Sequence, residues 1–130
     1  MARLPLYIEP VPLDLAYNDA QTNLKAVEAA VAARLAARPE VPSEERLFLF
    51  PELTLTAFVT KAPPAFTLEP MDAVVAAAAD IARRHRTGLA VGFPERHPSG
   101  KPLNALAVFG PDGTPAGAYR KNHLFTLGAN

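Results

Sequence analysis

A short apolar run in the first half of the chain restricts its folds more than any other sequence feature. Residues 47–50 read Leu-Phe-Leu-Phe, with no polar residue between them. A strand that alternates apolar and polar residues can leave one face in water, whereas an unbroken apolar run requires cover on both faces. Segments with helical spacing of apolar residues lie on either side of this run. The sequence therefore predicts a layered α/β protein in which helices cover a sheet.

Two segments have the apolar periodicity of amphipathic helices. The first covers residues 19–37, and Asn18 with Gln21 resembles a capping box at its start. The second is expected to begin at Pro70, because proline suits the first turn of a helix, and to stop before Gly88. Its last turn is rich in arginine and histidine, which favours a solvated basic helix end over an anion site.

Four other segments have the composition of strands. Residues 4–8 form a short run that its proline restricts to an edge, and residues 89–93 form a second apolar run. Residues 103–109 and 117–120 flank a Gly-Pro-Asp-Gly-Thr turn signal, so these two are predicted to form a hairpin. The expected order is strand, helix, strand, helix, strand, strand, strand in one domain. Helices would then cover one face of the sheet, and the other face would still need cover.

The composition excludes several classes of function. Thirteen basic and thirteen acidic residues cancel, so no net field draws the chain to nucleic acid or to an anionic membrane. Neither a secretory leader nor a long apolar span is indicated, which predicts a cytoplasmic protein. The three histidines are far apart and cysteine is absent, so we expect no metal, no cofactor and no cysteine nucleophile from these residues. The expected partner is a small, specific molecule.

Two charged residues follow the ends of predicted strands. Glu52 comes just after the apolar run, and Lys121 ends the last strand of the predicted hairpin. A carboxylate and an ammonium group at strand ends can serve as a general base and as an oxyanion stabiliser in acyl transfer. Each also has a simpler interpretation, since Glu52 can be a solvated loop carboxylate and Lys121 a surface cation.

Two further residues are secondary candidates. Phe58 ends the apolar, threonine-rich segment 53–58, which is either a strand or a packed loop. Phe58 can line a substrate pocket, although core packing explains an apolar side chain equally well. His123 follows Lys121 closely and is predicted to orient the Lys121 loop rather than to bind a metal or act as a base.

Four motifs surround these residues in a fixed order. They are Phe50-Pro51-Glu52-Leu53, Gly92-Phe93-Pro94-Glu95-Arg96, Asn104-Ala105-Leu106-Ala107-Val108 and Tyr119-Arg120-Lys121-Asn122-His123-Leu124-Phe125. Together they resemble the nitrilase superfamily of carbon-nitrogen hydrolases, over essentially the whole chain. The last of the four is the most specific part of the resemblance.

The resemblance implies a four-layer α-β-β-α sandwich and a Glu-Lys-Cys triad that acts on amides, nitriles or carbamoyl compounds. At the matching positions, Glu52 is the general base and acid, and Lys121 holds the oxyanion of the tetrahedral intermediate. In the family, the cysteine nucleophile lies further along, beyond another strand. The resemblance also implies small amide or nitrile substrates, no cofactor and assembly into a homo-oligomer.

This sequence ends at Asn130, before a matching cysteine. Residues 1–130 are therefore expected to be the N-terminal half of the sandwich. Such a partial carbon-nitrogen hydrolase domain would be inactive alone, because its base has no nucleophile to activate. A truncated product, a split reading frame, a fragment and a genuine short protein all fit this expectation.

Two alternative functions stay open at this point. The first is a non-catalytic pseudoenzyme that uses the half-sandwich for binding or oligomerisation, with an exposed apolar sheet face. The second is a small-ligand α/β domain unrelated to hydrolases. A large distance between Glu52 and Lys121 would favour the second.

Overall fold

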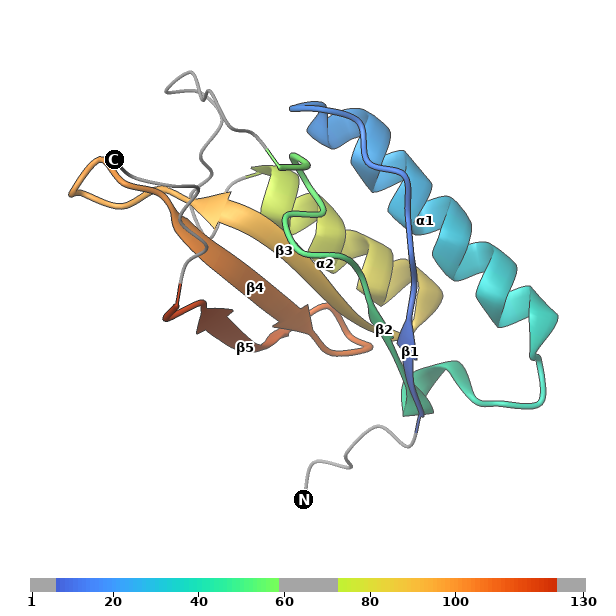
Figure 1. The fold of residues 1–130 in the computed structure, drawn as a ribbon. Helices are drawn as coiled ribbons and strands as arrows, with labels where there is room; N and C mark the ends of the chain where they lie inside the picture. The colour runs from blue at the N-terminus through green and yellow to red at the C-terminus, as the bar shows by residue number, and fades with distance from the viewer. Residues whose placement is uncertain (1–6, 59–72, 124–130) are drawn as a thin grey trace.

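In the part of the chain that the structure describes, residues 7–58 and 73–123, a five-stranded sheet carries two helices on one face (Figure 1). This computed structural model contains the strands and helices in the predicted order, with one added turn of 3-10 helix. The elements are β1 (Tyr7–Pro10), α1 (Ala20–Ala37), η1 (Ser43–Glu45), β2 (Arg46–Leu49), α2 (Ala73–His85), β3 (Gly88–Glu95), β4 (Leu103–Phe109) and β5 (Pro115–Arg120).

The strands lie in the sheet in their sequence order, β1-β2-β3-β4-β5. β1, β2 and β3 are mutually parallel, because the crossovers that join them contain α1 and α2. β4 and β5 are antiparallel to their neighbours, because short connections join them. The predicted hairpin of β4 and β5 is confirmed, and Gly113 takes a positive φ of 81° in its turn.

The hydrophobic core lies between the helices and one face of the sheet. Alternate residues of β2, β3 and β4 point toward the helices, as the two-residue period of a strand requires. Burying each large aliphatic or aromatic side chain contributes roughly 1.5–3 kcal/mol, so this layer fixes the positions of the central strands. Members of the core with no exposed surface include Val27, Val31, Phe48, Ala78, Ala82, Leu89 and Val91.

The opposite face of the sheet is also apolar, and no helix of the described residues covers it (Figure 1). Ile8 is 61% exposed and Tyr119 is 58% exposed, while Leu47, Leu49 and Leu106 are half-buried. A sheet with apolar side chains on both faces is typical of an inner layer of a sandwich. The prediction that a second face still needs cover is therefore confirmed for this part of the chain.

β2 begins with a buried arginine that joins three elements. Arg46 is 3% exposed, and its guanidinium donates to the Glu9 carboxylate of β1 at 3.1 Å. The same group donates to the backbone carbonyls of Arg34 and Arg38 at 3.0 and 3.3 Å. A cation at these carbonyls complements the negative end of the α1 dipole. Arg46 thus ties the C-terminal end of α1 to the start of the parallel strands.

The expected cap of the first helix is wrong by one position. Asp19, and not Asn18 with Gln21, caps α1, because its carboxylate accepts a hydrogen bond from the backbone N–H of Thr22 at 3.1 Å. The Thr22 hydroxyl donates to the second carboxylate oxygen at 2.7 Å. Asn18 itself takes a left-handed conformation, with φ 48°, one residue before the cap.

For residues 53–58 the sequence permits a strand or a packed loop, and the structure shows the loop. Leu53 and Ala57 have φ of 53° and 60°, values that no strand contains. The predicted helix start at Pro70 and residues 4–6 of the predicted first strand lie outside the described residues. Neither helix in residues 7–58 and 73–123 has the length and apolarity needed to cross a membrane.

Candidate active site

The structure brings Glu52 and Lys121 into direct contact. Lys121 Nζ lies 2.9 Å from Glu52 Oε1, although 69 positions separate the two residues in the sequence. Glu52 lies in the turn after β2, and Lys121 is the first residue after β5. The large separation that would have favoured an unrelated ligand-binding domain is therefore not observed.

The turn after β2 reaches β5 by crossing the open face of β3 at a glycine. The backbone N–H of Leu55 donates to the Gly92 carbonyl at 3.1 Å, and the Gly92 N–H donates to the Thr54 hydroxyl at 3.4 Å. A Cβ at Gly92 would lie only 2.5 Å from the Leu53 backbone nitrogen, so no other residue fits without a shift. Gly92 therefore allows the close approach that carries Glu52 over β3 toward β4 and β5.

Asn104, the second residue of β4, contacts both members of the pair. Its side-chain amide donates to Glu52 Oε1, the same oxygen that Lys121 contacts. Its backbone carbonyl accepts a hydrogen bond from the Lys121 N–H at 2.9 Å. The sequence assigns no role to Asn104, although it begins one of the four motifs. A polar residue near the start of an otherwise apolar strand is the signal that could have identified it.

These contacts favour the ionised form of Glu52. The hydrogen bond from Lys121 lowers the pKa of the Glu52 carboxyl most strongly, partial burial opposes that effect, and the Asn104 hydrogen bond lowers the pKa further. Glu52 is therefore a carboxylate at neutral pH and can accept a proton. Its side chain is 54% exposed and that of Lys121 is 38% exposed, so in this structure solvent reaches both.

A concave region of about 390 Å³ surrounds the pair on the open face of the sheet. Its charged and amide side chains are Glu52, Asn104 and Lys121, which lie together, and the rest of its lining includes Leu106 and Tyr119. An apolar depression with a few convergent polar groups is typical of a small-molecule site. The chemistry available here is proton transfer by a carboxylate beside a fixed cation.

A family model described as carbon-nitrogen hydrolase matches residues 8–130. The chain belongs to the carbon-nitrogen hydrolase family. The resemblance to the nitrilase superfamily that the motifs indicate is thereby confirmed. Among curated proteins, no sequence match to this chain is found.

Solved structures share the fold of this carbon-nitrogen hydrolase chain. An amidase from Nesterenkonia sp. matches with a TM-score of 0.75 and 22% identity, over 92% of this chain and 44% of the amidase. An N-terminal amidase matches with a TM-score of 0.72 and 19% identity, over 91% of this chain and 28% of that one. A carbon-nitrogen hydrolase from Helicobacter pylori G27 matches with a TM-score of 0.69 and 23% identity, over 89% and 40%. The chain thus spans less than half the length of these proteins, in agreement with the expected part of a nitrilase-type sandwich.

Two residues that the sequence predicts for the site do not line the cavity. Phe58 is 57% exposed and is not among the residues that surround the cavity. His123 is exposed, and within residues 7–58 and 73–123 its ring forms no hydrogen bond with Lys121. Their assigned roles, lining a substrate pocket and orienting the lysine loop, stay predictions.

An ion pair between Arg120 and Glu95 ties the end of β5 to the end of β3. Arg120 donates to both oxygens of Glu95, with its Nε 3.0 and 3.1 Å from them and one terminal nitrogen 2.8 Å from Oε1. Glu95 ends β3 and is only 7% exposed. A bidentate pair of this kind restricts orientation as well as distance. It therefore holds the residue next to Lys121 in place, a role that the motif pattern alone does not reveal.

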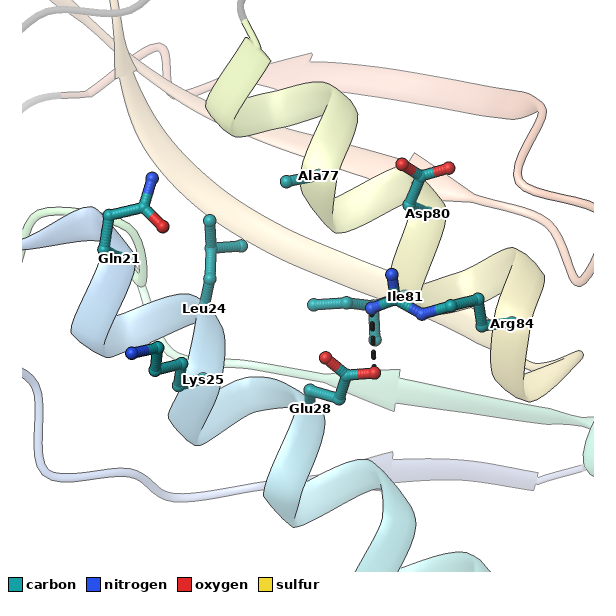
Figure 2. Close-up of a pocket in the computed structure, with 8 residues that line it drawn as sticks. All are labelled: Gln21, Leu24, Lys25, Glu28, Ala77, Asp80, Ile81 and Arg84. Carbon is teal, nitrogen blue, oxygen red and sulfur yellow. Dashed lines mark hydrogen bonds and ion pairs between the residues drawn. The ribbon is translucent and has the colours of Figure 1, made fainter.

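Three of the four basic residues at the end of α2 are exposed, as predicted, and this end also contacts the first helix. Arg84 and His85 of α2 contact the same carboxylate oxygen of Glu28 in α1, at 2.8 and 3.0 Å. Figure 2 shows the groove between the two helices, with Lys25 and Glu28 on one wall and Asp80 and Arg84 on the other. Charges of both signs line this groove. Among the described residues, no group of three His, Cys, Asp or Glu side chains is arranged to hold a metal ion.

Proposed function

We propose that this chain supplies the general base and the oxyanion site of an enzyme that hydrolyses amide carbon-nitrogen bonds. The observation that carries this proposal is the contact between Glu52 and Lys121 in a member of the carbon-nitrogen hydrolase family. In the proposed reaction, Glu52 accepts and returns protons, and Lys121 stabilises the negative charge that develops on the carbonyl oxygen. Both groups lie in one depression, which allows them to act on the same substrate.

The proposed reaction proceeds through a cysteine thiol that these 130 residues do not contain. Glu52 accepts the thiol proton, the sulfur bonds to the amide carbon, and the carbonyl oxygen becomes an oxyanion held by Lys121. Glu52 then gives the proton to the leaving nitrogen, so that the C–N bond breaks and a thioester remains. Water activated by Glu52 cleaves the thioester, which releases a carboxylic acid and restores the thiol.

We infer that the substrate is a small amide. A nitrile or a carbamoyl compound is the alternative substrate. Two solved structures with this fold are described as amidases, one of them determined with acrylamide and another with a Gln-Gly peptide. The depression around Glu52 has apolar walls and its polar groups at one place. Such a lining suits an uncharged substrate with one carbonyl group to orient.

The first test is the coding sequence that follows the Asn130 codon, read in all frames for a cysteine in an apolar strand. If it is present, the polypeptide that joins it to residues 1–130 is expected to release ammonia from short aliphatic amides, whereas the 130 residues alone should not. In that polypeptide, Glu52→Gln should lower kcat by at least about 100-fold, because proton transfer by a side chain typically contributes 100- to 10,000-fold.

Glu44→Gln is the matched control for Glu52→Gln. Glu44 is an exposed glutamate of η1, outside the residues that surround the candidate site. Its replacement makes the same change of charge and size and should leave turnover unaltered. Full turnover in the Glu52→Gln variant would refute the role of Glu52 as the base.

A second candidate function is a binding or oligomerisation module without catalysis. The absence of cysteine from the 130 residues and the exposed apolar sheet face favour it. A coding sequence that stops after Asn130, together with a chain that is monomeric and melts cooperatively, would support a binding module rather than a truncated enzyme. Assembly into a homo-oligomer only through a longer polypeptide would instead support the hydrolase.

A further inference from the structure

The two hydrogen bonds on the Glu52 carboxylate are distributed unequally between its oxygens. Lys121 Nζ and the Asn104 amide both contact Oε1. Among the described residues, none donates a hydrogen bond to Oε2. One oxygen of the carboxylate is therefore occupied by two donors, and the other is free to exchange a proton.

The position of Asn104 explains why it can hold this arrangement. It lies on β4 opposite Pro94, and Ala105, the next residue, points into the core. The side chain of Asn104 therefore points to the open face, where the loop after β2 brings Glu52. The Asn104 backbone carbonyl accepts from the Lys121 N–H at the same time, so one residue sets the positions of both charged groups.

We propose that Asn104 is a positioning residue for Glu52, whose amide shares Oε1 with Lys121 and leaves Oε2 to accept and return the proton. This inference rests on the proposed function, in which Glu52 is the base. A lysine ammonium on a flexible stem is a point charge and does not by itself fix the plane of a carboxylate. A second donor from a short side chain on a strand restricts that rotation. Since the amide is neutral, it does so without a second positive charge.

The side chain of Asn104 can be changed without changing its backbone contact. Any residue at position 104 keeps the carbonyl that accepts from the Lys121 N–H, so the end of β5 retains its anchor. Asn104→Ala removes the amide donor. Asn104→Asp keeps nearly the same shape, and it replaces a donor by a charged acceptor that repels the Glu52 carboxylate.

The test is a pH titration of the 130-residue chain by NMR of ¹³C-labelled glutamate carboxyl groups. The Glu52 resonance is identified by its absence in Glu52→Gln. The pKa of Glu52 should be higher in Asn104→Ala than in the wild-type chain, because a hydrogen bond to the ionised form is lost, and higher again in Asn104→Asp. Circular dichroism of each variant verifies that the fold is retained, and the isosteric Asn104→Asp serves if Asn104→Ala does not fold.

Asn122→Asp is the matched control for the added charge. Asn122 is exposed and adjoins Lys121, but it is not among the residues that surround the cavity. Its replacement should move the Glu52 titration less than Asn104→Asp does. A Glu52 pKa that is the same in the wild-type chain and in Asn104→Ala, with equal shifts in the two aspartate variants, would overturn the proposal.

A kinetic readout separates this inference from the proposed function. In a polypeptide that supplies the nucleophile, Asn104→Ala should move the acidic limb of the kcat profile to higher pH and lower kcat by about 10- to 100-fold, the size typical of a misplaced catalytic group. If Glu52→Gln abolishes turnover but Asn104→Ala leaves the acidic limb unchanged, the role of Asn104 is refuted and the role of Glu52 is not. The carboxyl titration needs no turnover, so it decides the positioning role even where hydrolysis is absent.

Discussion

Lys121 can hold an oxyanion only if its contact with Glu52 leaves hydrogen-bond donors available. An ammonium group has three N–H donors, and the contact with Glu52 Oε1 uses one of them. Two donors then remain for the carbonyl oxygen of a substrate. The ion pair therefore orients the lysine and leaves it two donors, so the proposed base and the proposed oxyanion site can act side by side.

Lys121→Met removes the ammonium group and keeps the length of the side chain. Its effects on kcat and on the pKa of Glu52 therefore come from the lost charge and hydrogen bond, not from lost packing. In a polypeptide that supplies the nucleophile, kcat is expected to fall by about 100- to 1000-fold, the usual loss for an oxyanion donor. The Glu52 pKa should rise, because its strongest hydrogen bond is removed. Steady-state ammonia release and a carboxyl titration measure the two effects.

Lys101→Met provides the comparison for Lys121→Met. Lys101 is an exposed lysine in the turn between β3 and β4, so the same substitution there should leave both measurements unchanged. If the two variants behave alike, Lys121 has no role in the chemistry.

At this scale the sequence predicts the charged residues better than the neutral ones. Glu52 and Lys121 are recognisable because each charge follows the end of an apolar strand. Asn104 is not, since a neutral amide in a strand has many structural uses and its role depends on which loop crosses above it. The role of Gly92 is equally hard to predict, because a glycine in a strand does not reveal which backbone segment approaches it.

At the scale of elements, the crossing of β3 by the loop after β2 determines whether a site exists. Gly92→Ala is expected to destabilise the chain by about 1–3 kcal/mol, because the new Cβ would overlap the backbone of Leu53. The displaced loop would also lengthen the contact between Glu52 and Lys121. Urea denaturation measures the first effect, and loss of the downward shift in the Glu52 pKa reports the second.

Gly117→Ala is the control for Gly92→Ala on the same sheet. A Cβ at Gly117 would meet no atom within 4 Å, and β5 is exposed along its length. This substitution should leave stability within about 0.5 kcal/mol of the wild type. Equal stability of the two variants would show that the loop does not press on β3.

Element types follow from the sequence, whereas their ends depend on single contacts. The hairpin of β4 and β5 is predictable because Pro-Asp-Gly chemistry acts locally. The cap of α1 is not, because Asn18 and Asp19 are adjacent and both suit an N-cap, and only the contact with Thr22 selects between them. The loop at residues 53–58 has strand-like composition, and its packing over Gly92 overrides that preference.

At the scale of the molecule, carboxylate pairs make stability dependent on pH. Partial burial would raise the pKa of Glu9, but hydrogen bonds from Arg34 and Arg46 outweigh it, so the pKa is lowered. The hydrogen bond with His85 is the largest cause of the lowered pKa of Glu28. A folded pKa below the unfolded one gives stabilisation that is present above about pH 4.3 and is lost as pH falls through the folded value.

We therefore expect the melting temperature of the chain to be maintained toward pH 5 and to fall progressively below about pH 4.3. Differential scanning calorimetry between pH 7 and pH 3 measures this dependence. Glu9→Gln should melt lower than the wild type at pH 7 and lose less on acidification, because one of the pairs is already absent. A melting temperature that does not change down to pH 3 would contradict the assignment.

The whole architecture is predictable from the sequence up to the second face of the sheet. The unbroken apolar run at residues 47–50 requires cover on both sides, and α1 with α2 provides only one of the two layers. What lies against the other face does not follow from these residues, since apolar side chains such as Ile8 and Leu49 accept any apolar surface. The proposed catalytic roles also do not follow from these residues by themselves, because the proposed nucleophile is not among the 130 residues.

The order in which the chain is made separates the two members of the ion pair in time. Because 69 positions lie between them, a ribosome that adds 5–20 residues per second completes Glu52 roughly 3–14 s before Lys121. β1, α1 and β2 all precede Glu52 in the chain, so they are made before this interval begins, while the Glu52 carboxylate still lacks its cation. An interruption of synthesis before the end of β5 would therefore leave Glu52 without Lys121, and the two residues of the proposed site would never meet.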